Sequence, residues 1–282
     1  MKKMIVCLAA YLIVAFSFKV VSADEGVSSV NEARLERYIT DLYKQIDFGR
    51  VAPLSYEVFD KAYHGYLNLR NAGSLNKDKE IISICDFSLP SSESRLWIID
   101  LITKKVLFHT FVAHGQGSGD DMATSFSNAE NSHKSSLGFY VTGDTYDGEH
   151  GTSLRLVGMD QGFNDAAFDR GIVVHGAPYV CDKYVCKKGR LGRSWGCPAV
   201  PAALSLPIIN TIKEGTCLFI YYPDNKYMSN AYWVNKQVSY LPESDIYADA
   251  LPQQPTKPRV RRIEYVHNGV VDSVKIIPLD LE

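Results

Sequence analysis

A cysteine and a histidine in the second half of this 282-residue chain have the residue types and surroundings of a nucleophile and its base. His175 and Gly176 close the apolar run at 172–174, and Cys197 lies in a Ser-Trp-Gly-Cys-Pro segment at 194–198. A β-branched run predicts a strand, which delivers His175 from its end. Gly196 lets the backbone turn tightly beside the thiol. We therefore predict that Cys197 attacks a carbonyl carbon while His175 takes and returns the proton.

The residues after Cys197 predict where the thiol is placed. Pro198 suits the first turn of a helix, so we expect Cys197 at or near a helix N-terminus. There the helix dipole and the free N–H groups favour thiolate over thiol. Pro201 and Pro207 argue against one continuous helix, and we expect two short helices, the second capped by Ser205.

These residues resemble the L,D-transpeptidase (YkuD-type) catalytic domain family, in which a His-Gly pair precedes Ser/Thr-His-Gly-Cys. The chain resembles most closely the Gram-negative branch of this family, which carries the motif Ser-x-Gly-Cys-Pro-Ala. Residues 194–199 match that motif. Trp195 departs from the common motif histidine, and Ala199 stands where many relatives carry Arg or Asn. The resemblance covers roughly residues 80 to 222. It includes Arg95-Leu96-Trp97, Val112-Ala113-His114-Gly115, Ser135-Ser136-Leu137-Gly138-Phe139-Tyr140, Ser153-Leu154-Arg155-Leu156 and Asn164-Asp165.

The resemblance implies an enzyme that acts on peptidoglycan stem peptides without a cofactor. Cys197 would be the nucleophile, with His175 as base and later acid, and the carbonyl of Gly176 would orient the imidazole. Backbone N–H groups of Trp195, Gly196 and Cys197 would form the oxyanion hole. The thiolate would attack the third stem residue, commonly diaminopimelate, expel the terminal D-alanine and form a thioester. Another stem peptide, a lipoprotein lysine or a free amino acid would then resolve it.

Three other readings stay open on the sequence. If water resolves the thioester, the protein is an L,D-carboxypeptidase. It can also be a non-catalytic peptidoglycan-binding protein that has kept the fold. A zinc site built from His175, Cys181, Cys186 and Cys197 is the third reading, although a Cys-x4-Cys spacing is poor for zinc.

Several polar residues are candidates to hold the substrate. Arg193 is the first choice for the substrate carboxylates because it adjoins Ser194, itself a candidate contact. Arg155 is a further candidate, whereas solvated roles suit Arg170 and Arg190 better. His114 follows a strand and can line the cleft or serve a structural role. The remaining candidates are Trp195 as an apolar wall or a core anchor, and Asp165 and Asp169 as residues that orient His175.

Five cysteines follow residue 23, and an odd number in an oxidising compartment predicts at least one free thiol. Cys85 and Cys217 lie in apolar runs and should be buried. Cys181 and Cys186 flank a short polar segment and can close a small disulfide, which leaves Cys197 unpaired.

Residues 1–23 resemble a cleavable secretory signal, with two early lysines, an apolar stretch and a Val-Ser-Ala exit. We therefore expect export to the periplasm. This segment carries three lysines and no acid, so the net charge changes from −2 to −5 without it. That balance gives no reason to expect a nucleic-acid partner.

The remaining chain is expected to form a mainly β (α+β) fold, a sandwich or barrel with additions at both ends. Apolar residues recur at helical spacing between about residues 30 and 72, which predicts a helical pair within an N-terminal segment at 24–79. Short strands separated by turn residues predict the catalytic domain at 80–223. A linker and a hairpin around Asn268-Gly269 complete the prediction for 224–282.

Overall fold

The structure is a computed structural model that describes residues 24–242, 260–267 and 270–278. It divides into two compact units, Met1–Tyr240 and Leu241–Glu282. The predicted secretory signal at 1–23 and most of the predicted linker lie outside the described residues. In the described part of the chain, no helix is both long enough and apolar enough to cross a membrane.

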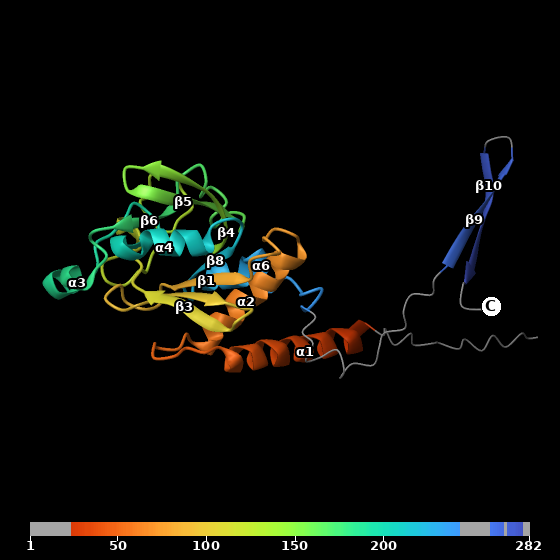
Figure 1. Cartoon of the computed structure of the whole chain (residues 1–282), viewed down its shortest axis with the longest axis horizontal. Helices are drawn as coiled ribbons and strands as arrows, with labels where there is room; N and C mark the ends of the chain where they lie inside the picture. Colours follow the sequence, from red (N-terminus) through yellow and green to blue (C-terminus); the bar gives the residue numbers. More distant parts are fainter. Residues whose placement is uncertain (1–23, 243–259, 268–269, 279–282) are drawn as a thin grey trace, which may run out of the picture. The chain divides into compact units, whose positions relative to one another are not determined.

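One eight-stranded sheet forms the centre of the first unit, in the order β3-β2-β1-β8-β4-β5-β6-β7 (Figure 1). Two neighbouring pairs run parallel, β1 with β8 and β6 with β7, and the other neighbours are antiparallel. The mainly β fold predicted from the sequence is confirmed. The strands are β1 (Ile81–Asp86), β2 (Leu96–Asp100), β3 (Lys105–Thr110), β4 (Gly138–Gly148), β5 (Gly151–Gly158), β6 (Val173–Ala177), β7 (Ala199–Pro201) and β8 (Cys217–Tyr221).

Helices α1 (Asp24–Gln45) and α2 (Tyr56–Asn71) form the predicted N-terminal helical pair. The side chain of Ser55 caps α2 by accepting a hydrogen bond from Val58 N at 3.5 Å. Tyr43 of α1 packs its ring against Tyr56 and Phe59 of α2. Aromatic burial therefore joins the two helices, and α2 in turn contacts β1 and β8.

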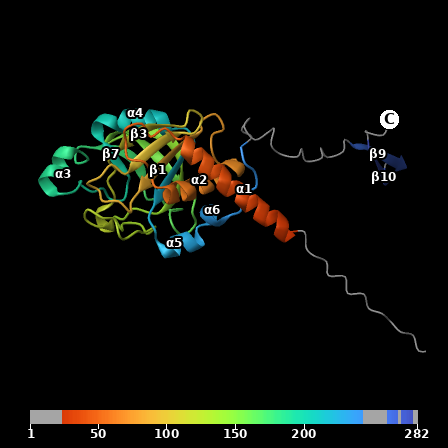
Figure 2. The ribbon, with the colours of Figure 1, turned by 90° about the horizontal axis from the view of Figure 1, so that it is seen from below.

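Two short helices follow β8, namely α5 (Asn225–Asn230) and α6 (Tyr232–Asn235). The buried Asn68 of α2 donates to the carbonyls of Trp233 at 2.9 Å and Lys236 at 2.7 Å. The chain that we expected to begin as a linker at residue 224 is thus helical and packed on α2 as far as Asn235. Figure 2 shows α4 (Ala202–Ile212) on one side of the sheet and α5 and α6 on the other.

The helix after the cysteine segment differs from the prediction of two short helices. A single helix, α4, runs through Pro207, and Ser205 is a buried residue inside it rather than a cap. Pro207 removes one backbone hydrogen bond. Burial of Ile208, Ile209 and Ile212 holds the helix together around it.

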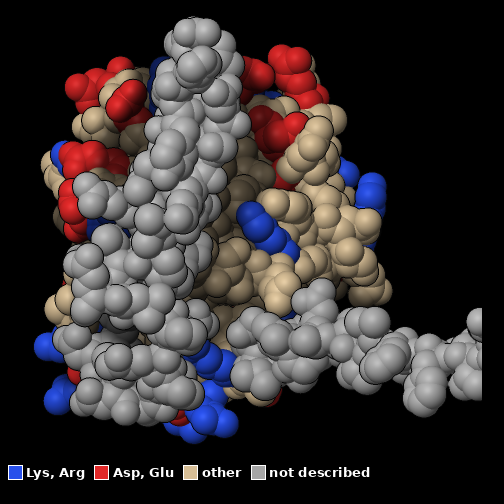
Figure 3. All heavy atoms as spheres, turned by 90° about the vertical axis from the view of Figure 1, so that its right-hand side faces the viewer, with Lys and Arg blue, Asp and Glu red and all other residues tan. Residues whose placement is uncertain are grey.

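The described part of the second unit is a hairpin of β9 (Val260–His267) and β10 (Val270–Pro278), as predicted. The expected Asn-Gly turn at 268–269 lies outside the described residues. On the face of the molecule in Figure 3, both acidic and basic side chains are visible. Charges of both signs agree with a net charge as small as −2.

Candidate active site

Strands β6 and β7 place the candidate base and nucleophile side by side. The two strands are parallel, and His175 pairs with Ala199, the second residue after Cys197. The sulfur of Cys197 accepts a hydrogen bond from Val173 N at 3.4 Å and lies 3.7 Å from Gly171 O. The thiol is therefore held against the start of the strand that carries His175.

A backbone carbonyl fixes the tautomer of His175. Its Nδ1 lies 3.1 Å from Gly176 O, and because a carbonyl only accepts hydrogen bonds, Nδ1 carries the proton. The Nε2 lone pair is then free to act as a base. Asp165, a candidate orienter, instead accepts from Asn128 Nδ2 at 2.7 Å and from Gly162 N at 2.7 Å. Asp169 is exposed.

Burial sets the resting protonation of the pair. It lowers the pKa of His175, and His150 lowers it further, against the opposing effect of the Gly176 carbonyl. Burial raises the pKa of Cys197, while Val173 N and Arg170 act the other way. Both shifts favour the uncharged form of each group. The pair therefore rests as a neutral thiol and a neutral imidazole.

The expected helix N-terminus at Cys197 is absent, and that prediction was wrong. Pro198 leads into β7, and α4 begins only at Ala202. Alignment of Ala199–Pro201 with β6 extends the sheet here, so the proline serves as a strand entry instead of a first helical turn. The thiol consequently has no helix dipole to favour thiolate.

The hydroxyl of Ser194 holds the cysteine turn together. It accepts from Gly196 N at 3.1 Å and donates to Cys197 O at 2.6 Å. Ser194 is buried and its hydroxyl is engaged within the turn, while its contact with substrate stays a prediction. Gly196 has a φ of 126°, and an added Cβ would lie 2.8 Å from Lys134 O, so only glycine fits.

The predicted oxyanion hole is reduced to two backbone donors. The amide of Gly196 already donates to Ser194. Within the described part of the chain, the amides of Trp195 and Cys197 have no hydrogen-bond acceptor. One of these N–H groups belongs to Cys197 itself and the other to the residue two positions before it, and both are candidates to bind a developing oxyanion.

The arginines predicted to hold substrate are engaged with other groups. Arg193 donates to Asp120 Oδ1 at 2.8 Å and to Gly119 O at 2.7 Å. The guanidinium of Arg155 lies over the rings of Tyr146, at 4.5 Å, and Phe168, at 5.5 Å. The partners of Arg193 lie 73 and 74 residues away in the sequence, beyond the reach of any local pattern.

Arg170, for which we favoured a solvated role, lies close enough to Cys197 to act on its pKa. It is half-buried and donates to Ser127 O at 2.9 Å and Lys134 O at 2.8 Å. Its charge also favours the thiolate form of Cys197. Arg170 therefore supports the loop behind the cysteine turn, while Arg190 lies 3.7 Å from Asp120.

His114 is buried, which favours the structural role left open by the sequence, and its contact with substrate stays a prediction. Its Nδ1 accepts from Arg95 Nη2 at 2.7 Å, and its Nε2 faces Gly119 O at 3.4 Å. Burial, with a contribution from Arg95, lowers the pKa of His114 to about 4. Its backbone carbonyl accepts from Ser194 N at 3.0 Å, so His114 supports the cysteine turn from within.

The disulfide that Cys181 and Cys186 could close is not formed in the structure, where both cysteines are free. Cys181 precedes α3 (Asp182–Lys188), and Cys186 lies in that helix. Five helical residues turn through about 500°, which directs the two side chains away from each other. No three His, Cys, Asp or Glu side chains of the described residues are grouped to hold a metal ion, so the alternative zinc site has no ligand set there.

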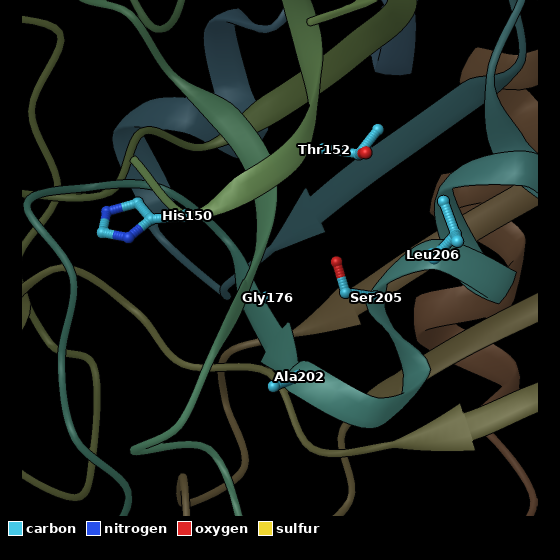
Figure 4. Close-up of a pocket in the computed structure, with 6 residues that line it drawn as sticks. All are labelled: His150, Thr152, Gly176, Ala202, Ser205 and Leu206. Atoms are coloured by element: carbon cyan, nitrogen blue, oxygen red, sulfur yellow. The ribbon is translucent and has the colours of Figure 1, made fainter. Parts of the chain in front are cut away.

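Sequence reasoning missed His150. This residue lies in the turn between β4 and β5, and its ring stacks on that of His175 with centroids 4.5 Å apart. His150 is one of the residues that line a hollow of about 200 Å³. Figure 4 shows these residues. Only pairing of β5 with β6 brings this turn to the site, and no local motif indicates it. The hollow is lined by His150, Thr152, Gly176, Ala202, Ser205 and Leu206.

Comparison with protein families decides the assignment. The model of the L,D-transpeptidase catalytic domain matches residues 51–221, well over half of the chain. The chain belongs to the L,D-transpeptidase catalytic domain family. The family match begins at residue 51 instead of near residue 80, and so includes α2 as well as the pair His175 and Cys197.

Solved L,D-transpeptidases are similar at low identity. An enzyme from Mycobacterium smegmatis shares 12% identity over 51% of this chain and 59% of its own, with a TM-score of 0.32. L,D-transpeptidase 3 from Mycobacterium tuberculosis, in complex with a faropenem-derived adduct, shares 12% identity over 51% of this chain and 61% of its own, with a TM-score of 0.32. An Enterococcus faecium L,D-transpeptidase mutant shares 12% identity over 51% of this chain and 49% of its own, with a TM-score of 0.29. The matches thus span about six-tenths or less of these chains, and no curated protein matches significantly.

Proposed function

We propose that this protein is a cysteine-dependent L,D-transpeptidase that acts on peptidoglycan stem peptides through a thioester acyl-enzyme. The observation that carries the proposal is the pairing of β6 with β7, which brings the sulfur of Cys197 against Val173 N. On the same strand, Gly176 O fixes His175 with a free Nε2. A thiol beside an oriented imidazole is the arrangement that acyl transfer requires.

In the first half-reaction, Nε2 of His175 accepts the thiol proton while the sulfur of Cys197 attacks the carbonyl of the third stem residue. The N–H groups of Trp195 and Cys197 stabilise the oxyanion. When the tetrahedral intermediate collapses, the C–N bond breaks and the imidazolium gives its proton to the leaving amine of D-alanine. A thioester and a neutral His175 remain.

The second half-reaction reverses the proton path. His175 takes a proton from the acceptor amine as the new C–N bond forms and the C–S bond breaks, and the proton returns to the sulfur. Acceptors by this proposal are another stem peptide, a lipoprotein lysine or a free amino acid. Water in the same position makes the protein an L,D-carboxypeptidase.

The setting of the reaction is part of the proposal. Export by residues 1–23 would place the enzyme in the periplasm, where peptidoglycan is its substrate. The Ser-x-Gly-Cys-Pro-Ala pattern at 194–199 supports a place in the Gram-negative branch of the family.

Incubation with a defined disaccharide-tetrapeptide tests the proposal. We expect an intact-mass adduct on the wild-type chain and release of D-alanine, and neither from Cys197→Ala. Cys186→Ala, which removes an exposed thiol on α3, is the matched control and should behave as wild type. Turnover by Cys197→Ala would overturn the proposal, and muropeptide binding without any adduct would favour a non-catalytic binding protein.

A further inference from the structure

Trp195 presents an aromatic face to solvent beside the nucleophile. Its side chain is 71% exposed, although it stands only two residues before Cys197. One side of the indole is stacked on the ring of His133, with centroids 4.9 Å apart and planes within 8°. Two nearly parallel rings thus form a flat platform, and an exposed tryptophan held in one orientation is a ready contact surface.

Polar contacts hold the ring of His133, the partner of Trp195 in the platform. Gln116 Nε2 lies 2.9 Å from His133 Nδ1, and because the amide nitrogen only donates, Nδ1 accepts. The backbone of His133 has a φ of 53°, an unfavourable conformation for a residue with a side chain. Its carbonyl accepts from Gly117 N at 2.9 Å, which helps to maintain this conformation.

The platform is joined to the cysteine turn through close backbone contacts. An added Cβ on Gly115 would lie 2.5 Å from His133 O and 2.8 Å from Gly196 Cα. The buried hydroxyl of Ser135 accepts from Gly115 N at 3.0 Å and donates to Gly196 O at 3.1 Å. A ligand on the platform is therefore held at a fixed position relative to Cys197.

The surroundings of the platform favour an uncharged ligand. His133 forms no ion pair with any residue that the structure describes. The adjacent cation, Lys134, uses its Nζ to donate to Ser125 Oγ at 2.7 Å. The hydroxyl of Ser125 holds the ammonium group of Lys134, so the two stacked rings are the surface that is left for a ligand. A pyranose ring has an apolar C–H face that suits such a surface.

The distances agree with a sugar at one end of the donor. Two residues of chain span at most about 7 Å, to which the indole adds several ångströms. The three stem residues between the scissile carbonyl and the glycan span about 10 Å when extended. We propose that Trp195, supported by His133, binds the pyranose of the glycan that carries the donor stem peptide. This inference rests on the proposed function, because it takes the stem peptide as the donor.

Paired donors test the inference: a disaccharide-tetrapeptide and the same tetrapeptide without sugar, with D-alanine release as the readout. We expect Trp195→Ala, which keeps the backbone N–H assigned to the oxyanion, to raise KM for the disaccharide donor roughly tenfold relative to KM for the free tetrapeptide. Trp195→Phe should keep most of the preference. Tyr240→Ala removes an aromatic side chain that is 75% exposed elsewhere, and should not affect either donor.

Two outcomes would overturn the inference. An equal loss with both donors would mean that Trp195 only supports the cysteine turn, and no loss with either would mean that the platform binds nothing. If the wild-type chain turns over neither donor, the proposed function fails, and binding to Cys197→Ala then tests the platform separately. Quenching of Trp195 fluorescence at a lower concentration of disaccharide donor than of free peptide would support binding of the sugar to the platform. Equal quenching would reject it.

Discussion

The imidazole of His150 stacks on the imidazole of His175, with centroids 4.5 Å apart and planes within 21°. His150 comes from the β4–β5 turn, and His175 from β6. The charge that acts on His175 is that of His150, whereas Arg170 acts on Cys197. Helix α4 contributes no charged side chain. A charge on His150 lowers the pKa of His175.

His150→Phe should move the acid limb of the pH profile of kcat/KM to higher pH. The substitution keeps a stacked ring but removes the charge that lowers the pKa of His175, so the base is protonated at a higher pH. At pH 6 we expect a loss of roughly threefold, with little change at pH 8. His109→Phe, which alters a similar stack on Trp97 at 4.6 Å, is the control. An unmoved limb in His150→Phe would contradict this role.

Cys197 should react with iodoacetamide as an ordinary or weak thiol. Burial raises its pKa, so the alkylation rate should rise only above about pH 8.5 and show no plateau near neutral pH. A Cys181→Ser/Cys186→Ser background removes the two more accessible thiols, since Cys85 and Cys217 are buried. A rate that is already maximal at pH 7 would indicate a resting ion pair instead.

Ser194→Ala should reduce acylation without unfolding the domain. The change removes the acceptor of Gly196 N and the donor to Cys197 O, at a cost of about 1–3 kcal/mol. We expect kcat for D-alanine release to fall by roughly 10- to 100-fold while KM stays close to wild type. Thermal unfolding should show a modest loss of stability. A rise in KM alone would indicate that the hydroxyl contacts substrate after all.

His114 should make the first unit sensitive to acid. Its pKa of about 4 in the folded chain lies below the ordinary value near 6.5, so the unfolded chain binds more protons between these values. Its contribution is complete above pH 6.5 and is lost as the pH falls toward 4, by up to about 3 kcal/mol. Urea unfolding of wild type and His114→Gln at pH 4.5, 5.5 and 7.5 measures the difference. A constant difference across this range would refute it.

Local sequence patterns predicted much of the fold because the forces involved are local. Alternating apolar runs predicted the strands, and the stripe that contains Tyr43 and Phe59 predicted the helical pair. The family motif also indicated the contact between His175 and the Gly176 carbonyl, which the structure contains. These features depend on neighbours within a few residues of each other.

The errors concern partners that are distant in the sequence. Arg193 is paired with Asp120, 73 residues away, and His114 with Arg95, 19 residues away. His150 reaches the site only through the order of strands in the sheet. The helix expected after Cys197 was displaced because pairing with β6 outweighs the local preference of Pro198. The assignment of Cys197 and His175 as catalytic residues stays a prediction.

The connection between β6 and β7 carries α3, which has no buried residue and stands away from the sheet in Figures 1 and 2. Pairing of β6 with β7 fixes the positions of His175 and of the segment that follows Cys197, whatever the length of the connection between the two strands. A peptide tag or a fluorescent label can therefore be inserted after Lys188, at the exposed end of α3 and beyond Val185, which packs against the buried Ala177 and Ala199. The helix offers a handle for immobilising the protein on a surface with its cysteine turn intact.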